Sequence, residues 1–343
     1  MIRHLAAFYV PTGRLTMPFN LIGKLLLVFV LLLTSSPRPV LAQSPNDWRG
    51  FRGNDGRANV DINSGLKSGN FDLQLRWKKP VGSGYSGIAI SGERAVTMSA
   101  GKDKDLLVCF STTSGAKLWE TAVDENYPGE SGSFDGPVST PTIAGDSVFA
   151  LSAQGKLLAA NLEDGKIAWT RQLTEAPIAA PKPMYGFSCS PIVVGETVVA
   201  VCGGKDSFVC GFDLKTGETR WSSENDNAQC QSPTLMKIAN KQMIVAAGMT
   251  KLFGLDPTSG KKLFEYEHGG TGARGAFSIV PVQIDSQRIF IAHDDRSSSI
   301  VKVESQDKKF NATKSSTTRA IQNTFNVPVF HDDKLFGLSL IHI

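Results

Sequence analysis

The chain has 343 residues, of which 41% are hydrophobic and 20% are charged, a balance typical of a folded soluble protein. Four of its 36 Lys and Arg residues, but none of its 32 Asp and Glu residues, precede residue 43, so the remainder carries 32 of each sign. A neutral remainder has no electrostatic reason to bind nucleic acid or an anionic membrane surface, and we expect neither partner.

Residues 1–42 have the pattern of a signal peptide. Lys24 precedes an unbroken apolar run, Leu25–Leu33, and Val40-Leu41-Ala42 places small residues at positions −3 and −1 of a signal-peptidase site. A transmembrane anchor is the alternative, but nine apolar residues are too few to cross a bilayer. We therefore expect cleavage after Ala42, a periplasmic or secreted mature protein and no membrane span after cleavage. No cysteine lies at the cleavage site, so no lipid anchor is expected there.

The rest of the chain reads as a lead-in followed by strands. Residues 43–71 are rich in Gly, Asn, Asp, Arg and Ser, and we expect them to form an irregular lead-in. From residue 72 to residue 343, short strand patterns alternate with turn signals, without a convincing amphipathic helix. The first expected strand is Leu73–Trp77. Each later unit opens with a strand that contains proline and continues through a turn into a second apolar strand; these prolines are Pro141, Pro191, Pro233, Pro281 and Pro328.

A glycine turn joins the third and fourth expected strands of each unit. In Gly211–Trp221, the Asp213 carboxylate is expected to accept from N–H groups of the turn, Gly217 supplies a positive φ, and Trp221 anchors the returning strand. Three further copies have their glycine and closing aromatic at Gly115 and Trp119, at Gly165 and Trp169, and, with Asp256, at Gly260 and Phe264. Successive glycines lie 50, 52 and 43 residues apart, a period typical of an array of supersecondary units.

This repeat predicts an all-β fold. Four antiparallel strands per unit, arranged radially, make a β-propeller blade, and the units predict about five blades plus an incomplete closing blade. The last unit shows strand patterns only at Phe325–Phe330 and Leu335–Leu338. The sequence therefore predicts a propeller over residues 72–343 that is truncated at its C-terminus.

The glycine turns resemble the pyrroloquinoline quinone (PQQ)-like repeat, A-x-D-x-x-T-G-x-x-x-W, which Gly211–Trp221 matches at every fixed position except the first. The resemblance covers residues 72–343 and implies a propeller whose tryptophans wedge between neighbouring blades. The family includes quinoprotein dehydrogenases and non-catalytic members such as the propeller lipoprotein of the outer-membrane assembly machinery. The dehydrogenases' vicinal cysteines and calcium ligands have no match here, so the resemblance implies the exported, non-catalytic type.

Motifs for catalysis and metal binding are weak. Gly270–Gly275 satisfies G-x-G-x-x-G, but a strand pattern follows where dinucleotide binding requires a helix, so we interpret it as a loop between blades. His293-Asp294-Asp295 is interpreted as a solvated turn, because adjacent residues of an extended chain point to opposite sides. Cys202 and Cys210 flank a hairpin turn and could form a disulfide, whereas no C-x-x-C pair suggests zinc. We expect no enzyme activity, no cofactor and no metal.

The loops that lead into each blade's first strand converge at one mouth of a propeller's channel. Aromatic and amide groups that converge on such a funnel suit a peptide or a glycan. We therefore select as ligand-binding candidates Tyr85, Asp135, Tyr185, Phe187, Gln229 and Arg274. Loops without a dedicated ligand are the alternative. The predicted function is a binding or scaffold module for a protein or another macromolecule of the cell envelope, and a quinoprotein oxidoreductase is the alternative function.

The signal-peptide prediction is tested by the mass of the exported protein. We expect the mature chain to begin at Gln43, because the small residues before it fit signal peptidase. Intact-mass spectrometry of protein recovered from the envelope or the medium measures this directly. A mass that retains Leu25–Leu33 would instead indicate an anchored protein.

Overall fold

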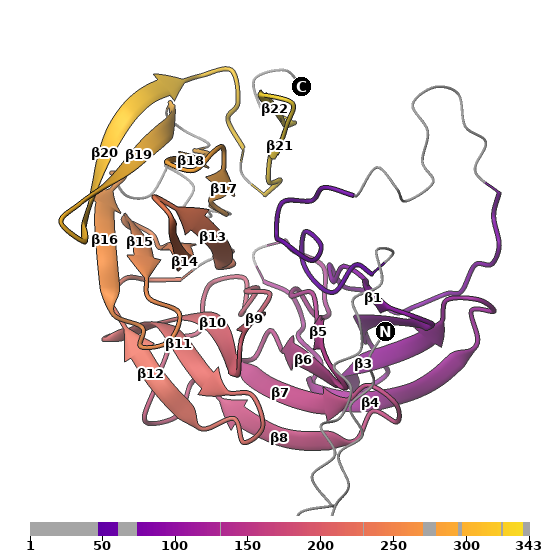
Figure 1. Cartoon of the computed structure of the whole chain (residues 1–343). Coiled ribbons are helices and arrows are strands. Elements are labelled where there is room, and N and C mark those ends of the chain that lie inside the picture. The colour runs from indigo at the N-terminus through magenta and orange to yellow at the C-terminus, as the bar shows by residue number, and fades with distance from the viewer. Residues whose placement is uncertain are drawn as a thin grey trace, which may run out of the picture. The chain divides into compact units, whose positions relative to one another are not determined.

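The computed structural model of the protein describes residues 47–60, 74–130, 132–228, 230–269, 279–293, 297–323 and 325–338. These residues form strands and loops and no helix. Five four-stranded antiparallel sheets and one two-stranded sheet follow one another around a common centre (Figure 1). Within each sheet, neighbouring strands are consecutive in the sequence. The predicted all-β propeller of five four-stranded blades and a shorter closing blade is confirmed. The predicted signal peptide lies outside the described residues.

The first sheet consists of β1 (Ala89–Ser91), β2 (Arg94–Ala100), β3 (Lys104–Ser111) and β4 (Lys117–Glu125). The second consists of β5 (Thr142–Ala144), β6 (Ser147–Leu151), β7 (Lys156–Asn161) and β8 (Ile167–Gln172). The third consists of β9 (Ile192–Val194), β10 (Thr197–Gly204), β11 (Ser207–Asp213) and β12 (Thr219–Ser223). The fourth consists of β13 (Thr234–Ile238), β14 (Lys241–Ala247), β15 (Lys251–Leu255) and β16 (Lys262–Glu267). The fifth consists of β17 (Val282–Gln283), β18 (Arg288–Ile291), β19 (Ser298–Gln306) and β20 (Lys309–Thr318), and the last of β21 (Val329–His331) and β22 (Lys334–Phe336).

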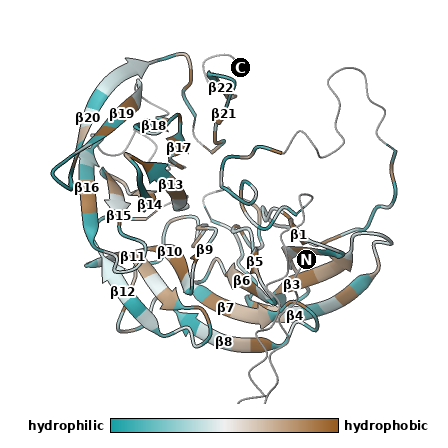
Figure 2. Ribbon diagram, in the orientation of Figure 1, coloured by the Kyte–Doolittle hydropathy of each residue, from teal (hydrophilic) through white to brown (hydrophobic). Residues whose placement is uncertain are grey.

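Burial changes from the middle strands to the outer strands of each sheet. The middle strand β10 is buried along its whole length, because neighbouring sheets cover both of its faces. In the outer strand β12, a buried Trp221 lies between exposed residues, and β20 is exposed along most of its length. Figure 2 shows the same change as hydrophobic residues in β10 and hydrophilic residues in β12 and β20. The core therefore lies between the sheets.

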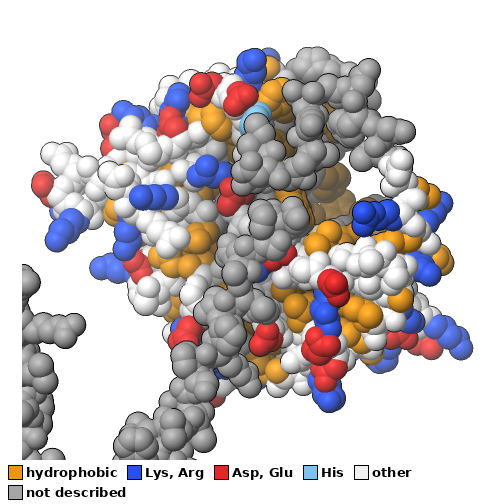
Figure 3. Space-filling view, turned by 45° about the vertical axis from the view of Figure 1, so that its right-hand side comes forward, with side chains coloured by type: hydrophobic (Ala, Val, Ile, Leu, Met, Phe, Trp, Pro, Cys, Tyr) orange, Lys and Arg blue, Asp and Glu red, His pale blue; other side chains and the backbone are white. Residues whose placement is uncertain are grey.

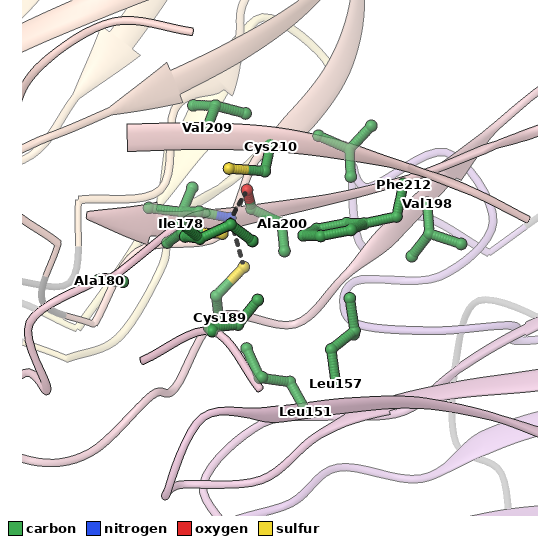
Figure 4. Packing of buried hydrophobic residues seen from close by; sticks show 14 of the residues in the cluster. Leu151, Leu157, Ile178, Ala180, Cys189, Val198, Ala200, Val209, Cys210 and Phe212 are labelled. Carbon is green, nitrogen blue, oxygen red and sulfur yellow. Dashed lines mark hydrogen bonds between the residues drawn. The ribbon is translucent and has the colours of Figure 1, made fainter. Parts of the chain in front are cut away.

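The largest buried cluster spans the second, third and fourth sheets. Leu151 and Leu157 of the second sheet face Val198 and Phe212 of the third (Figure 4). All five cysteines are free thiols, and three of them lie in this cluster: Cys189, Cys202 and Cys210. The neighbouring Cys210 thiol, together with burial, raises the pKa of the Cys202 thiol. No disulfide joins the hairpin.

A tryptophan ring packs on the turn glycine of the sheet that follows it in the chain. The pairs are Trp77 with Gly115, Trp119 with Gly165, Trp169 with Gly217 and Trp221 with Gly260. The fit leaves no room for a side chain, since a Cβ added at Gly217 would lie 2.5 Å from the Trp169 ring. Three of the four indoles also donate their N–H to a carbonyl of the same turn, at 2.9–3.1 Å.

Each turn is held in shape by its first side chain. Oδ1 of Asp213 accepts from the backbone N–H groups of Lys215 and Thr216, both at 2.9 Å. Oδ2 accepts from Arg220 at 2.6 Å, and these contacts, with the Arg220 bond largest, lower the pKa of Asp213 to about 2. Gly217 adopts a φ of 68°, as the sequence predicts. The turn is therefore preformed as a receptor for the preceding sheet's tryptophan.

The strand predicted at Leu73–Trp77 is wrong for residues 74–77, which run beside no other described strand and form no ladder. The missing partner is the physical reason, because an extended segment becomes a strand only through backbone pairing. Trp77 nevertheless packs on the turn of the first sheet, as the repeat predicts, since its indole N–H donates to the Thr112 carbonyl at 2.9 Å.

We expect Gly217→Ala to destabilise the protein more than Gly195→Ala. Both glycines have a positive φ, 68° and 58°, but no atom lies within 4 Å of a Cβ added at Gly195. The left-handed backbone costs an alanine about 1–2 kcal/mol at either position, and the clash with Trp169 adds about 1–3 kcal/mol at Gly217 alone. Urea unfolding of both variants measures the difference. Equal losses would contradict the proposed packing of tryptophan on glycine.

Candidate functional site

Hydroxyl side chains link the sheets around the central channel. Thr140, Ser190 and Ser232 each stand before a proline, and that proline immediately precedes an inner strand rather than lying within it, as the sequence had suggested. The Gly87 N–H donates to the Thr140 hydroxyl, the Thr140 N–H to the Ser190 hydroxyl, and the Ser190 N–H to the Ser232 hydroxyl, each at 3.0 Å. The first four sheets are thus tied each to the next by the same bond, and the three hydroxyl oxygens lie around the channel.

These hydroxyls form the floor of a cavity of about 510 Å³, which we call the aromatic cavity. It is lined by Phe51, Tyr85, Gly132, Ser133, Val138, Thr140, Tyr185, Ser188, Ser190, Cys230, Ser232, Val280 and Phe325. The lining combines aromatic rings with hydroxyls, and none of its described residues carries a charged side chain. Its volume is that of a typical ligand site, about 300–1,000 Å³.

Two aromatic pairs stand at the rim of the aromatic cavity. The rings of Tyr85 and Phe134 are 6.3 Å apart, and the Tyr85 hydroxyl accepts from the Phe134 N–H at 2.9 Å. Tyr185 and Phe325 meet edge to face at 6.4 Å. Phe134 and Phe325 are 74% and 60% exposed, so apolar surface is available to a ligand at the mouth.

The structure brings together two of the six predicted site residues. Tyr85 and Tyr185 line the aromatic cavity, whereas Asp135 is exposed outside its lining. Phe187 is 1% exposed and packs beside Gly155 in the core, so it is not available to a ligand in the cavity. Gln229 and Arg274 lie outside the described residues.

Sequence reasoning missed the set of hydroxyls around the channel and the Phe51 side chain. The hydroxyls had a visible signal, because Ser or Thr precedes three of the five repeat prolines. Phe51 had none, since the sequence does not show that the lead-in returns to the channel.

The lead-in crosses the channel and connects distant sheets. Trp48 and Ile90 exchange backbone hydrogen bonds at 2.9 and 2.7 Å, which joins the lead-in to β1. Arg52 donates to the Pro328 carbonyl at 2.9 Å, just before β21. Phe51 lines the aromatic cavity and also a second cavity of about 550 Å³, formed by residues that follow the prolines of the inner strands. Phe51 therefore lies between the two cavities, as does Ser190.

Asp105 is a buried carboxyl beneath the loop that carries the Phe134 rim. It is 0% exposed, its Oδ2 accepts only a long 3.4 Å bond from the Tyr127 N–H, and its Oδ1 has no partner in the described part of the chain. Burial, the largest cause, and the charges of Asp124 and Asp135 raise the pKa of Asp105 to about 7, against the Tyr127 bond. Near neutral pH, ionisation of Asp105 therefore places an uncompensated charge under this loop.

Comparisons with known proteins agree with the observed architecture. A profile of the family described as outer membrane protein assembly factor BamB matches residues 58–206 and 103–339, which together span most of the chain. BamB from Moraxella catarrhalis has a similar structure, with a TM-score of 0.54 and 18% identity over 77% of this chain and 70% of that one. No curated protein matches the sequence. In the described part of the chain, no helix has the length and apolar character needed to cross a membrane.

Two dehydrogenase structures are also similar. The quinohemoprotein alcohol dehydrogenase from Comamonas testosteroni gives a TM-score of 0.53 at 14% identity, over 81% of this chain and 50% of that one. A europium-containing methanol dehydrogenase gives 0.53 at 13% identity, over 79% and 58%. This chain thus spans only half to three-fifths of the dehydrogenases, and at such identities the likeness shows the fold alone.

The residues of the channel do not fit a calcium-bound quinone. Calcium takes 6–8 oxygen ligands, carboxylates among them, at about 2.3–2.6 Å. Among the described residues that line either cavity, Asp55 is the sole carboxylate, and it lies 3.9 Å from Arg57. No catalytic step through a quinone follows from these side chains.

We expect the contribution of Asp105 to the stability of the protein to fall as the pH rises from about 4 to about 7. Its native pKa of about 7 exceeds the ordinary value, so the native state retains a proton that the unfolded state releases in this window. Asp105→Asn removes this titration. The unfolding free energy of the variant minus that of the wild type should therefore increase by on the order of 4 kcal/mol from the lower to the upper end of the window.

Urea unfolding at several pH values, with the exposed neighbour Asp103 changed to Asn as a control, measures the effect of Asp105. Parallel pH profiles for wild type and Asp105→Asn would show that Asp105 titrates alike in the native and unfolded states, and would contradict its assigned pKa.

Proposed function

The chain belongs to the family of the outer membrane protein assembly factor BamB, and we propose that it is an exported binding or scaffold module for a protein or another macromolecule of the cell envelope. The signal-peptide pattern of residues 1–42 supports a periplasmic or secreted location. The name of the family supports a protein partner. The observation that carries the proposal within this chain is the aromatic cavity with its exposed rim.

The chemistry of the aromatic cavity favours binding over catalysis. Its described lining contains rings and hydroxyls, groups that contact apolar surface and hydrogen-bond to a backbone without transferring protons at neutral pH. The described lining carries no charged side chain, so charge does not attract a ligand of one sign into the cavity. Figure 3 shows Lys and Arg side chains interspersed with Asp and Glu side chains on the face in view. We infer that the partner presents apolar or aromatic side chains on an extended, uncharged segment.

The rim offers large aromatic anchors of the kind that dominate binding energy. Truncation of such an anchor at the centre of an interface typically costs at least about 2 kcal/mol, roughly 30-fold in affinity. Tyr185 suits this role because its ring lines the cavity and meets Phe325 edge to face.

A photo-crosslinking amino acid at Tyr185 or Phe325 tests the proposal in living cells. We expect adducts with envelope proteins at both positions, and no adducts when the same group replaces Leu118, which is 45% exposed on the outer strand β4. For each partner identified, Tyr185→Ala should weaken binding by roughly 30-fold, and Leu118→Ala should leave it unchanged.

Two outcomes would overturn this function. The same adducts at Leu118 as at the rim would show that contact is not specific to the cavity. Calcium-dependent binding of pyrroloquinoline quinone at micromolar affinity, measured by calorimetry, would favour the quinoprotein alternative.

A further inference from the structure

The second cavity, which we call the arginine cavity, differs in charge from the aromatic cavity. Three of its lining residues are arginines of the lead-in, Arg49, Arg52 and Arg57, and Lys237 of β13 adds a fourth basic side chain. Asp55 is the one acidic residue among its described lining. All three arginines precede residue 58, where the family match begins, so the feature belongs to this chain's lead-in.

Arg49 is already neutralised. Its Nε and Nη2 donate to one oxygen of Asp47 at 3.0 and 2.8 Å, and the Asp47 side chain is 3% exposed. The other oxygen of Asp47 accepts from the Gly92 N–H at 2.9 Å. This ion pair fastens the lead-in to the first sheet and leaves little positive charge for a ligand.

Arg52 is buried without a carboxylate partner. It is 9% exposed, and its two short hydrogen bonds go to the carbonyls of Gly56 at 2.8 Å and Pro328 at 2.9 Å. Its Nη1 reaches the Val327 carbonyl only at 3.4 Å. Burial lowers the pKa of Arg52 to about 10, although the charge of Asp55 opposes this. Carbonyl dipoles thus hold a whole positive charge that an anion would stabilise further.

Arg57 adds a second guanidinium that solvent and ligands can reach. Its side chain is 50% exposed, and it donates to Gln283 at 3.0 Å. Its ion pair with Asp55 is loose, at 3.9 Å with both partners about half exposed, and exposed pairs of this kind contribute little. Arg57 therefore keeps donors for a further acceptor.

We propose that the arginine cavity is a binding site for a phosphate group, held by Arg57 and stabilised by the buried charge of Arg52. Guanidinium groups donate two parallel hydrogen bonds to phosphate oxygens, and a phosphate has enough oxygens to accept from two guanidinium groups and an ammonium together. A carboxylate, with two oxygens, satisfies fewer of these donors. The site lies across Phe51 from the aromatic cavity and is independent of the proposed protein partner.

Calorimetric titration of the full chain with inorganic phosphate, at constant ionic strength, tests the site. We expect saturable binding that Arg57→Gln weakens at least tenfold, because a charge-assisted donor is lost. Arg319→Gln serves as the matched control, since this exposed arginine lies outside both cavities and removes the same charge. Arg52→Gln should abolish binding. If it unfolds the lead-in instead, Arg57→Gln still decides the question.

A second arm distinguishes free phosphate from a lipid headgroup. Co-sedimentation with phosphatidylglycerol vesicles, compared with phosphatidylcholine vesicles, shows whether a membrane phosphate reaches the site. Dependence on Arg57 in either arm supports the site and identifies its source of phosphate. Absence of binding in both arms, or an equal loss in Arg319→Gln, would overturn the proposal.

Discussion

The packing of a tryptophan on the glycine of the next sheet's turn is the contact on which the rest of this fold depends. Because the Trp169 ring occupies the space that a Cβ at Gly217 would need, the distance between consecutive sheets is set by an aromatic ring in contact with backbone. Repetition of this contact near the outer strands brings the inner strands together at the centre. The pre-proline hydroxyls are thereby placed where the Thr140 N–H reaches Ser190 and the Ser190 N–H reaches Ser232. A contact at the periphery thus determines the geometry of the channel.

The channel itself is divided by a segment that is not part of any blade. Phe51 lines both cavities, and the two differ in chemistry because different parts of the chain complete them. Loops before the inner strands supply rings and hydroxyls to the aromatic cavity. The lead-in supplies guanidinium groups to the arginine cavity, where Arg52 depends on carbonyls rather than carboxylates. One propeller can in this way present an uncharged surface to one ligand and a positively charged surface to another.

Local patterns predicted the parts of this structure that are held locally. The Asp213–Gly217 turn depends on bonds between residues two to four positions apart, so its sequence is sufficient to predict it. The alternation of strands and turns predicted the five sheets for the same reason. The environment of individual side chains was harder to predict from the sequence. Tyr185 and Phe187 are two residues apart, yet Tyr185 lines the aromatic cavity and Phe187 is buried beside Gly155. The position of Phe51 and the burial of Asp105 depend on residues far along the chain, and no local pattern encodes them.

The bond from Arg52 to Pro328 joins residues 276 positions apart, and this has a consequence for the order in which the protein acquires its structure. Each sheet pairs only consecutive strands, so successive sheets can form as the chain emerges during synthesis. The lead-in emerges before all of them, but its buried arginine finds its carbonyl partners only after the segment before β21 has appeared. Until then that arginine lacks these partners. The lead-in can therefore reach its final position only after the five four-stranded sheets have been synthesised, so the first residues of the propeller to emerge are among the last to be fixed.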